Sequence, residues 1–379
     1  MRWSYLIDAL ERRGWETEIY SSRHNPTRDT LSDKPSEARL AEARAQVMAR
    51  VGRAIGPLWR RAGVQPEAFP ANHLWSWTAR RGLRRRIEEL RPDIVVATIP
   101  PPAALFAAAA VAPAAGIPLV VDMRDNWAGH PTYDAGGRVL TRIEGRALRQ
   151  ADAIVGVTTG MAARLRRLHP WIEPRLQLLP NGFDPRLIDE RVGASAWPDR
   201  VTLIHPGVLY GDRGVGALLR AMGEPDLRDR VRLELVGNVD PGTATELAAR
   251  RHGVEVDVTG PRPWRATMDR VAAADIVAVI VPASMGDDVA WPVKLFEGLA
   301  LGKPILSITS GGATETLLRE IGQDHALARD GDADSIAEAL RGLLAGPPPA
   351  PATPAQLTTW DREAVAERYA ALLERLAKA

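Results

Sequence analysis

The sequence predicts an α/β protein of two Rossmann-like domains, each a doubly wound parallel sheet, that face each other across a cleft. Three observations support this fold class. The chain has 379 residues, which is more than one hydrophobic core usually organises. From Asp93 onward, short runs rich in valine and isoleucine alternate with helical patterns, which is typical of a parallel sheet. A polar segment at 187–200 divides these units into two series.

The two series place the strands and domains as follows. The first domain, 1–186, is expected to hold strands near 94–98, 119–122, 153–157 and 176–179, and an alanine-rich buried helix near 103–115. The second domain, 201–356, follows the 187–200 linker and is expected to hold strands near 201–205, 231–236, 254–258, 276–281 and 305–308. Some helix is expected between residues 36 and 55. The Pro-rich connector 346–354 leads into a final segment, 357–379, whose amphipathic helix at 361–377 is expected to pack back onto the first domain.

The composition excludes several kinds of site. The content of 45% hydrophobic and 25% charged residues is ordinary for a globular protein. There is no cysteine, which excludes disulfides, thiol nucleophiles and cysteine-ligated metals. The first residues, MRWSY, contain no long apolar run, so neither a signal peptide nor a membrane anchor is expected, and we predict a cytoplasmic protein.

Arginine is concentrated between residues 50 and 91, although the net charge of the chain is only +2. Such a segment can make peripheral contact with anionic lipid at the inner face of a membrane, or bind an acidic acceptor. A solvated helix face is an equally good interpretation. No basic-aromatic module surrounds these arginines, so a nucleic-acid partner is not expected.

The segment 291–305, WPVKLFEGLALGKPI, predicts a helix. Pro292 can occupy the first helical position, and Gly302 with Pro304 ends the helix. Leu295 is spaced to pack inward with the other apolar side chains.

Lys294 and Glu297, three residues apart, share another face of this helix. A cation near a helix start suits a phosphate group. A carboxylate one turn later can accept hydrogen bonds from two neighbouring hydroxyls, as a ribose or hexose presents them. The alternative is an ordinary surface salt bridge.

The segment 205–214, HPGVLYGDRG, predicts a strand end, a turn and a helix start. Gly207 allows a pyrophosphate to approach the backbone closely, and Arg213 supplies positive charge. The alternative for Arg213 is a surface arginine at a helix start.

A long loop at 123–137 directly follows a predicted strand, and loops in that position often carry function. Its polar and aromatic residues are Arg124, Asp125, Asn126, Trp127, His130 and Tyr133. The alternative is a structural ion-pair network of Asp122, Arg124 and Asp125.

Four motifs follow one another along the chain: ATIPP at 97–101, VDMRDNW at 121–127, LPNGFD at 179–184 and PVKLFEGLALGKPI at 292–305. They resemble motifs of the retaining GT-B glycosyltransferases, in particular family four, which uses nucleotide-sugar donors. The first two are similar to those of a bacterial branch that makes polysaccharides and natural products. Each motif alone is weak, whereas four in the same order are specific.

The resemblance implies a donor site in the second domain, formed by Gly207, Arg213, Lys294, Leu295 and Glu297. Arg213 and Lys294 would hold the diphosphate, and Glu297 would contact the nucleotide ribose. No metal or other cofactor is expected, because these cations and the helix ends stabilise the departing diphosphate.

In the first domain, the resemblance implies that Arg124 and Asp125 are catalytic. Arg124 falls where many members have a histidine near the reacting carbon. Asp125 is the candidate to orient or deprotonate the acceptor hydroxyl, whether that of a glycan, a lipid-linked molecule or a small molecule.

The chain departs from the family pattern in three places. The turn at 205–214 commonly carries two basic residues in the family, and here Val208 or Leu209 stands where the earlier one would be. Val289 stands where the family often has a glutamate that contacts the donor sugar, and Asp287 and Asp288 are the nearest substitutes. The family normally has a strand and a glycine pair several residues before the Arg2-Trp3 pair. Either the native start lies upstream of Met1, or the first domain lacks its first strand.

The resemblance, taken with these features, implies a glycosyltransferase of polysaccharide or glycoconjugate biosynthesis. It would move a hexosyl group from a nucleotide diphosphate sugar to a hydroxyl acceptor, with retention at the anomeric carbon. One alternative is a nucleotide-sugar 2-epimerase on the same fold. Another is a catalytically degenerate protein that binds a nucleotide or a partner.

Overall fold

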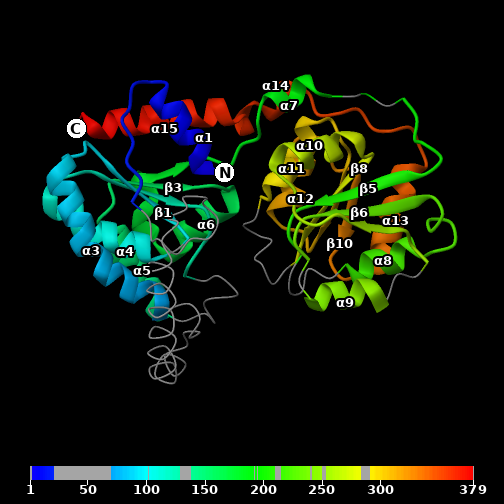
Figure 1. Cartoon of the computed structure of the whole chain (residues 1–379), viewed down its shortest axis with the longest axis horizontal. Helices are drawn as coiled ribbons and strands as arrows, with labels where there is room; N and C mark the ends of the chain where they lie inside the picture. The colour runs from blue at the N-terminus through cyan, green and yellow to red at the C-terminus, as the bar shows by residue number, and fades with distance from the viewer. Residues whose placement is uncertain are drawn as a thin grey trace, which may run out of the picture. The chain divides into compact units, whose positions relative to one another are not determined.

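A computed structural model describes residues 2–20, 70–100, 102–128, 138–191, 193, 195–209, 215–239, 241–249, 253–282 and 291–378. The chain divides into two compact units. Figure 1 shows the chain coloured from blue at its N-terminus to red at its C-terminus. The first contains Trp3–Leu179 and Arg368–Ala379, and the second contains Pro180–Glu367.

The first unit is built on a parallel sheet of four strands in the order β1-β2-β3-β4. The strands are β1 (Val95–Ile99), β2 (Leu119–Met123), β3 (Ala153–Gly156) and β4 (Leu176–Leu178). Among the described residues, β1 is the first strand of the chain and α1 precedes it. In the described part of this sheet, each strand pairs with the strand that follows it in the sequence. The order of the strands across the sheet is therefore their order along the chain.

Helices cover this sheet (Figure 1): α3, α4 and α5 lie on one side, and α1 and the end of α15 lie on the other. Their bounds are α1 (Arg2–Glu11), α3 (Pro70–Leu90), α4 (Pro102–Val111), α5 (Arg138–Leu148), α6 (Thr159–Leu168) and α15 (Arg362–Ala377). Helix α4 is buried on most of its surface, which explains why its sequence, PAALFAAAAV, is apolar all round. The turn Pro113–Ala115 continues it as a 3-10 helix.

The second unit is a parallel sheet of six strands in the order β10-β9-β8-β5-β6-β7. The strands are β5 (Val201–Pro206), β6 (Val231–Val236), β7 (Val256–Val258), β8 (Ile276–Val281), β9 (Ile305–Thr309) and β10 (Ala326–Arg329). The strand order reverses between β5 and β8, so this sheet is doubly wound.

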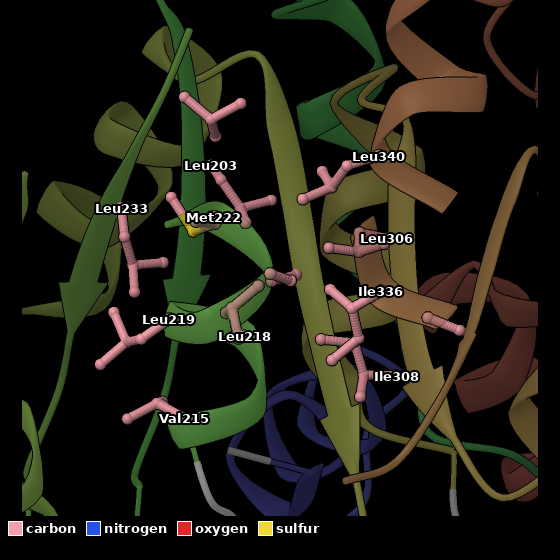
Figure 2. Close-up of a cluster of buried hydrophobic side chains, with 14 of the residues drawn as sticks. Leu203, Val215, Leu218, Leu219, Met222, Leu233, Leu306, Ile308, Ile336 and Leu340 are labelled. Carbon is pink, nitrogen blue, oxygen red and sulfur yellow. The ribbon is translucent and has the colours of Figure 1, made fainter. Parts of the chain in front are cut away.

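Each face of the second sheet has its own buried cluster. Figure 2 shows one of them, in which leucines of α8 (Gly216–Met222) and α13 (Ala333–Leu344) meet strand residues such as Leu203 and Ile308. The other cluster belongs to helices α10 (Trp264–Ala273), α11 (Val293–Ala300) and α12 (Ala313–Glu320). The remaining helices are α7 (Arg186–Asp189), α9 (Pro241–Ala249) and α14 (Pro354–Leu357). Burial on both faces explains the continuous apolar run of β8, IVAVIV.

The LPNGFD motif binds the start of α15. A β-carbon on Gly182 would lie 2.7 Å from the α-carbon of Arg362, so only glycine allows this approach. Asp184 is buried and pairs with Arg186 at 2.6 Å and with Arg362 at 2.5 Å. Burial alone would raise the pKa of Asp184, but the bonds from Arg186 and the charge of Arg362 outweigh it and leave that pKa below its usual value.

The predicted class of two parallel α/β sheets is confirmed, and all of the predicted strands are present. Strand β10 was not predicted, because its sequence, ALAR, has no β-branched residue and favours a helix locally. The helix expected between residues 36 and 55 lies outside the described residues. Within the described part of the chain, every helix is too short or too polar to cross a bilayer.

Candidate functional site

The carboxyl edge of the second sheet, where its strand order reverses, is the place where open α/β sheets bind ligands. Two glycines follow neighbouring strands there. Gly207 comes after β5 with a φ of 142°, and Gly237 comes after β6 with a φ of 148°. A β-carbon on Gly237 would lie 2.1 Å from the carbonyl oxygen of Gly207, so the turn after β6 needs glycine to pack against the backbone of the turn after β5.

Helix α11 carries the predicted donor residues. Pro292 is its N-cap, with a ψ of 136°, and not its first helical residue as predicted, because that ψ is extended. Gly302 follows the helix with a φ of 72°, as the sequence predicts for a helix end. A β-carbon on Gly298 would lie 3.0 Å from Ile305, so this glycine lets the helix lie close to the sheet.

The far end and the inner face of α11 are fixed by the rest of the second unit. Arg191 donates to the carbonyls of Ala300 and Leu299 at 2.7 and 3.2 Å, which satisfies the end of the helix. Leu295 is completely buried, and its N–H donates to Pro292 at 3.0 Å. Leu295 therefore anchors the helix on the sheet, and its place among donor-binding residues stays a prediction.

Lys294, in the first turn of α11, reaches over Gly207. Its ammonium nitrogen lies 2.9 Å from Nε2 of His205. A β-carbon on Gly207 would lie 2.6 Å from the same ammonium nitrogen. Gly207 thus makes room for the lysine side chain, which places a positive charge at the carboxyl end of β5.

His205 is completely buried and joins three elements. The strands β5 and β8 pair through Leu203 with Ile276 and through Ile204 with Val277. One position further on, Nδ1 of His205 lies 3.0 Å from the carbonyl oxygen of Ala278. A carbonyl only accepts, so Nδ1 carries the proton, and Nε2 accepts from the ammonium of α11.

Sequence reasoning treated His205 only as the end of a strand. A histidine at the end of a buried strand, followed directly by Pro206 and Gly207, was the available signal. Its partner Lys294 lies on a distant segment, and only the folded sheet brings the two together.

Glu297 is 8% exposed, and its Oε1 accepts a hydrogen bond from Nε1 of Trp264 at 2.7 Å. Burial raises the pKa of Glu297, and the bond from Trp264 and the charge of Lys294 offset only part of that effect. Trp264 is the first residue of α10 and was not predicted as part of the site. The carboxylate is therefore held in one orientation before any ligand binds.

An aromatic cluster supports the start of α11. The ring of Phe296 stacks on that of Trp360 with centroids 5.4 Å apart. Trp291 meets the two rings edge-on at 6.2 and 6.1 Å. Its Nε1 donates to the carbonyl of Ala313, the first residue of α12, at 3.0 Å. The cluster thereby fixes the starts of two helices at the same edge.

Some predicted positions lie outside the described residues. These are Arg213, Asp287, Asp288, Val289, His130 and Tyr133. The second cation of the predicted diphosphate clamp, Arg213, is among them.

In the first unit, Arg124 and Asp125 follow the carboxyl end of β2. Arg124 is half-buried, and its backbone N–H donates to Ile99 at 2.9 Å. Its Nη2 donates to the carbonyl of Pro100 at 3.1 Å, so the segment after β2 is held against the end of β1. Asp125 is exposed. The catalytic roles of both residues stay predictions.

Asp122 occupies a structural position. Its carboxylate is completely buried and accepts a hydrogen bond from Nε1 of Trp3 at 2.9 Å. The Trp3 ring packs edge-on against Tyr369 of α15, with centroids 5.4 Å apart. Asp122 therefore ties α1 to the sheet, and the Trp3 ring links α1 to α15.

The buried pair of Glu144 and His169 fixes the segment after β2 at Ala128. Glu144 of α5 accepts from the backbone N–H of Ala128 at 3.1 Å. Its other carboxylate oxygen lies 2.9 Å from Nε2 of His169, and both side chains are at most 3% exposed. This contact holds the chain just after Arg124 and Asp125, and nothing in the local sequence pattern predicted it.

Among the described residues, no three His, Asp or Glu side chains converge in a way that could hold a metal ion. The expectation that no metal takes part stays a prediction.

Two family models match consecutive parts of the chain. The model for a glycosyl transferase 4-like domain matches residues 1–182, and the model for glycosyl transferases group 1 matches residues 200–346. No curated protein sequence matches the chain.

Solved structures share the fold. HepE of Anabaena, solved with UDP and glucose, is 17% identical, with a TM-score of 0.55 over 79% of each chain. A glycosyltransferase of Rickettsia africae is 13% identical, with a TM-score of 0.60 over 80% of this chain and 82% of that one. A UDP-forming trehalose-phosphate synthase of Burkholderia vietnamiensis is 16% identical, with a TM-score of 0.55 over 79% and 77%.

The two family models together match most of the sequence, and the two parallel sheets are those of the solved structures. The chain belongs to the GT-B glycosyltransferases of the family-four type.

Proposed function

We propose that this glycosyltransferase moves a sugar from a nucleotide diphosphate sugar to a hydroxyl acceptor, with retention of the anomeric configuration and without a metal ion. The observation that carries the proposal is the placement of Lys294 over Gly207 at the point where the second sheet reverses. The similar fold of HepE, solved with UDP and with UDP-glucose, supports a nucleotide-sugar donor.

The second unit supplies the groups that a nucleotide diphosphate needs. Gly207 and Gly237 form the turns at the carboxyl ends of β5 and β6, and the ammonium of Lys294 lies beside Gly207 and carries a positive charge there. Glu297, fixed by Trp264, can accept two hydrogen bonds from a ribose. Arg213 is the second proposed diphosphate ligand.

In the proposed reaction, the enzyme has to stabilise the negative charge on the departing diphosphate, and a strong base is not needed. The acceptor hydroxyl attacks the anomeric carbon on the face from which the diphosphate leaves. The bond from that carbon to the phosphate oxygen breaks, and the same oxygen takes the hydroxyl proton, so the configuration is retained. Lys294 stabilises the charge that develops on the diphosphate, which is the part a metal ion would otherwise play.

We assign acceptor handling to Asp125 and Arg124 of the first unit. Asp125 has an exposed carboxylate that can orient the acceptor hydroxyl, and Arg124 carries a positive charge next to it in the chain. The acceptor is a glycan, a lipid-linked molecule or a small molecule.

The arginines of α3 support a peripheral membrane contact on the cytoplasmic side. Arg81, Arg84 and Arg91 lie exposed on or just after this helix, and they belong to the arginine-rich segment 50–91. Exposed arginines are attracted to anionic lipid. Sedimentation with phosphatidylglycerol vesicles, but not with phosphatidylcholine vesicles, is the expected result, and equal binding to both would contradict the proposal.

The activity is tested with purified protein, a panel of UDP-, GDP- and TDP-sugars, and a panel of lipid-linked and small hydroxyl acceptors in the presence of EDTA. We expect a glycosylated product whose anomeric configuration, measured by NMR, matches that of the donor. Lys294→Gln should lower kcat/KM about 100-fold, in line with the loss of one stabilising group at a transition state.

Other outcomes have distinct meanings. Formation of an epimer from the donor alone would show an epimerase. Nucleotide binding with no turnover across both panels would show a degenerate binding protein. A product of inverted configuration, or turnover abolished by EDTA, would contradict retention or metal independence respectively.

A further inference from the structure

We propose that His205 is a positioning residue that holds the ammonium of Lys294 over Gly207 without neutralising its charge, so that the full charge meets the donor diphosphate. This inference rests on the proposed function and extends it to a residue that contacts no part of the substrate.

The geometry fixes the state of the imidazole. Nδ1 of His205 lies 3.0 Å from the carbonyl oxygen of Ala278, and Nε2 lies 2.9 Å from the ammonium of Lys294. The carbonyl can only accept and the ammonium can only donate. Both contacts are satisfied together by one form of the ring, the neutral tautomer with its proton on Nδ1.

The charge of the group that holds Lys294 decides how much positive charge the lysine can offer to the diphosphate. A carboxylate in this place would hold the lysine equally well, but it would cancel the lysine charge and repel a diphosphate. A neutral nitrogen accepts one of the three ammonium protons and leaves the net charge intact. His205 is completely buried, so its ring is fixed by packing as well as by Ala278.

The arrangement also lowers the entropic cost of binding the donor. A lysine has a long, flexible side chain, and ordering it when the ligand arrives reduces affinity. Lys294 is already held at the carboxyl end of β5 by a residue of the protein itself, so less of that cost falls on the binding step.

Two substitutions at His205 distinguish its hydrogen bond to Lys294 from its contribution to the packing of the core. In His205→Asn the amide nitrogen occupies the place of Nδ1 and can still donate to Ala278, but the side chain is too short to reach Lys294. In His205→Gln the amide oxygen lies near the place of Nε2 and can accept from the ammonium. His325→Asn, at an exposed histidine of the same unit, is the matched control.

The affinity for UDP-, GDP- and TDP-glucose is measured by calorimetry on the full-length protein, with the melting temperature of each variant as a check on folding. For the sugar nucleotide that the wild type binds best, we expect His205→Asn to raise Kd about tenfold, the loss of one charge-assisted hydrogen bond. His205→Gln should recover most of that loss, and His325→Asn should leave Kd unaltered.

The coupling to Lys294 is tested with a double-mutant cycle. In a Lys294→Gln background, His205→Asn should no longer weaken binding, because the lysine that it positions is gone. Equal Kd values for the Asn and Gln variants, or an undiminished effect in the Lys294→Gln background, would overturn the proposal.

A measurement on the wild type keeps the proposal testable should His205→Asn unfold. The ¹⁵N chemical shifts of labelled histidine, assigned with His205→Gln, should show a neutral ring protonated on Nδ1 at pH 7. A ring protonated on Nε2 would refute it. If the wild type binds none of the three sugar nucleotides, the proposed function fails; if it binds one and the cycle shows no coupling, only the role of His205 fails.

Discussion

A β-carbon on Gly207 would lie 2.6 Å from the ammonium nitrogen of Lys294. The glycine that follows β5 is therefore required by a side chain of this protein. The ammonium of Lys294 can occupy its place only because residue 207 is a glycine.

Gly207→Ala should displace Lys294 and lower donor affinity. The new methyl group would overlap the ammonium, and a φ of 142° is strained for alanine, so we expect a loss of about 1–3 kcal/mol in stability as well. The measurement is Kd for the sugar nucleotide together with the melting temperature.

Gly322→Ala is the control for backbone strain alone. Gly322 also has a positive φ, of 64°, but a β-carbon on it would meet none of the described residues within 4 Å. It should lose stability and keep donor affinity. The same Kd change in both variants would show that strain, and not the displacement of Lys294, is responsible.

Glu297→Gln should stabilise the protein at neutral pH while it weakens donor binding. Burial raises the pKa of Glu297 above its ordinary value of 4.5, so the folded state holds this proton more tightly than the unfolded state. The wild type consequently loses stability, relative to the Gln variant, as pH rises from 4.5 through the raised pKa. Thermal unfolding of both proteins from pH 4 to pH 8 measures this difference.

Donor affinity should fall about tenfold in Glu297→Gln, since a carboxylate that accepts two ribose hydroxyls becomes a neutral amide. Glu320→Gln, at an exposed glutamate that follows in the same unit, is expected to change neither property. A constant difference in stability across the pH range would argue against a raised pKa.

Asp184→Asn should cost about 2 kcal/mol of stability at pH 7, the loss of charge-assisted hydrogen bonds to Arg186 and Arg362. The pKa of Asp184 is lowered in the fold, so this contribution is present above the ordinary value of 3.8 and is lost as pH falls through the lowered pKa. Urea unfolding at pH 7 and at pH 3 should therefore show a smaller difference at pH 3.

The matched control for Asp184 is Asp226→Asn. Asp226 pairs with Arg341 at 2.7 Å, but both side chains are about half exposed. Such a surface pair contributes less than about 1 kcal/mol. An equal cost for the two substitutions would mean that burial of the Asp184 cluster adds nothing.

Glu144→Ala should lower turnover and leave donor affinity intact. It removes the acceptor for the N–H of Ala128 and the partner of His169, both buried, at a cost of about 2–4 kcal/mol. The segment that carries Arg124 and Asp125 then loses its support, whereas the second unit is untouched. The comparison is kcat against Kd for the sugar nucleotide.

Glu144→Gln keeps an acceptor for Ala128 and should recover part of the turnover. Glu88→Ala, exposed on α3, is the neutral control. A parallel loss of donor affinity in Glu144→Ala would show that the substitution disturbs the whole chain.

Local patterns in the sequence predicted most of the fold. The run IVAVIV predicted a strand because β-branched residues favour extended backbone and a strand buried on both faces is apolar throughout. The run VRLELV predicted a strand because apolar and charged residues alternate in it. The helix that carries Lys294 and Glu297 was predicted from proline and glycine at its ends and from apolar residues spaced to pack inward. Strand β10, whose ALAR sequence lacks those preferences, depends on pairing with β9 and was missed.

The sequence by itself determined which residues carry charge at the site: Lys294 and Glu297 share a helix, and their spacing follows from helix geometry alone. Only the tertiary structure decided what holds them. His205 reaches Lys294 because the strand order reverses beside β5, and Trp264 reaches Glu297 because α10 and α11 cover the same face of the sheet. Neither contact could be predicted from a periodic pattern in the sequence. Each contact joins two distant segments, and these lie close together because of the order of the strands in the sheet.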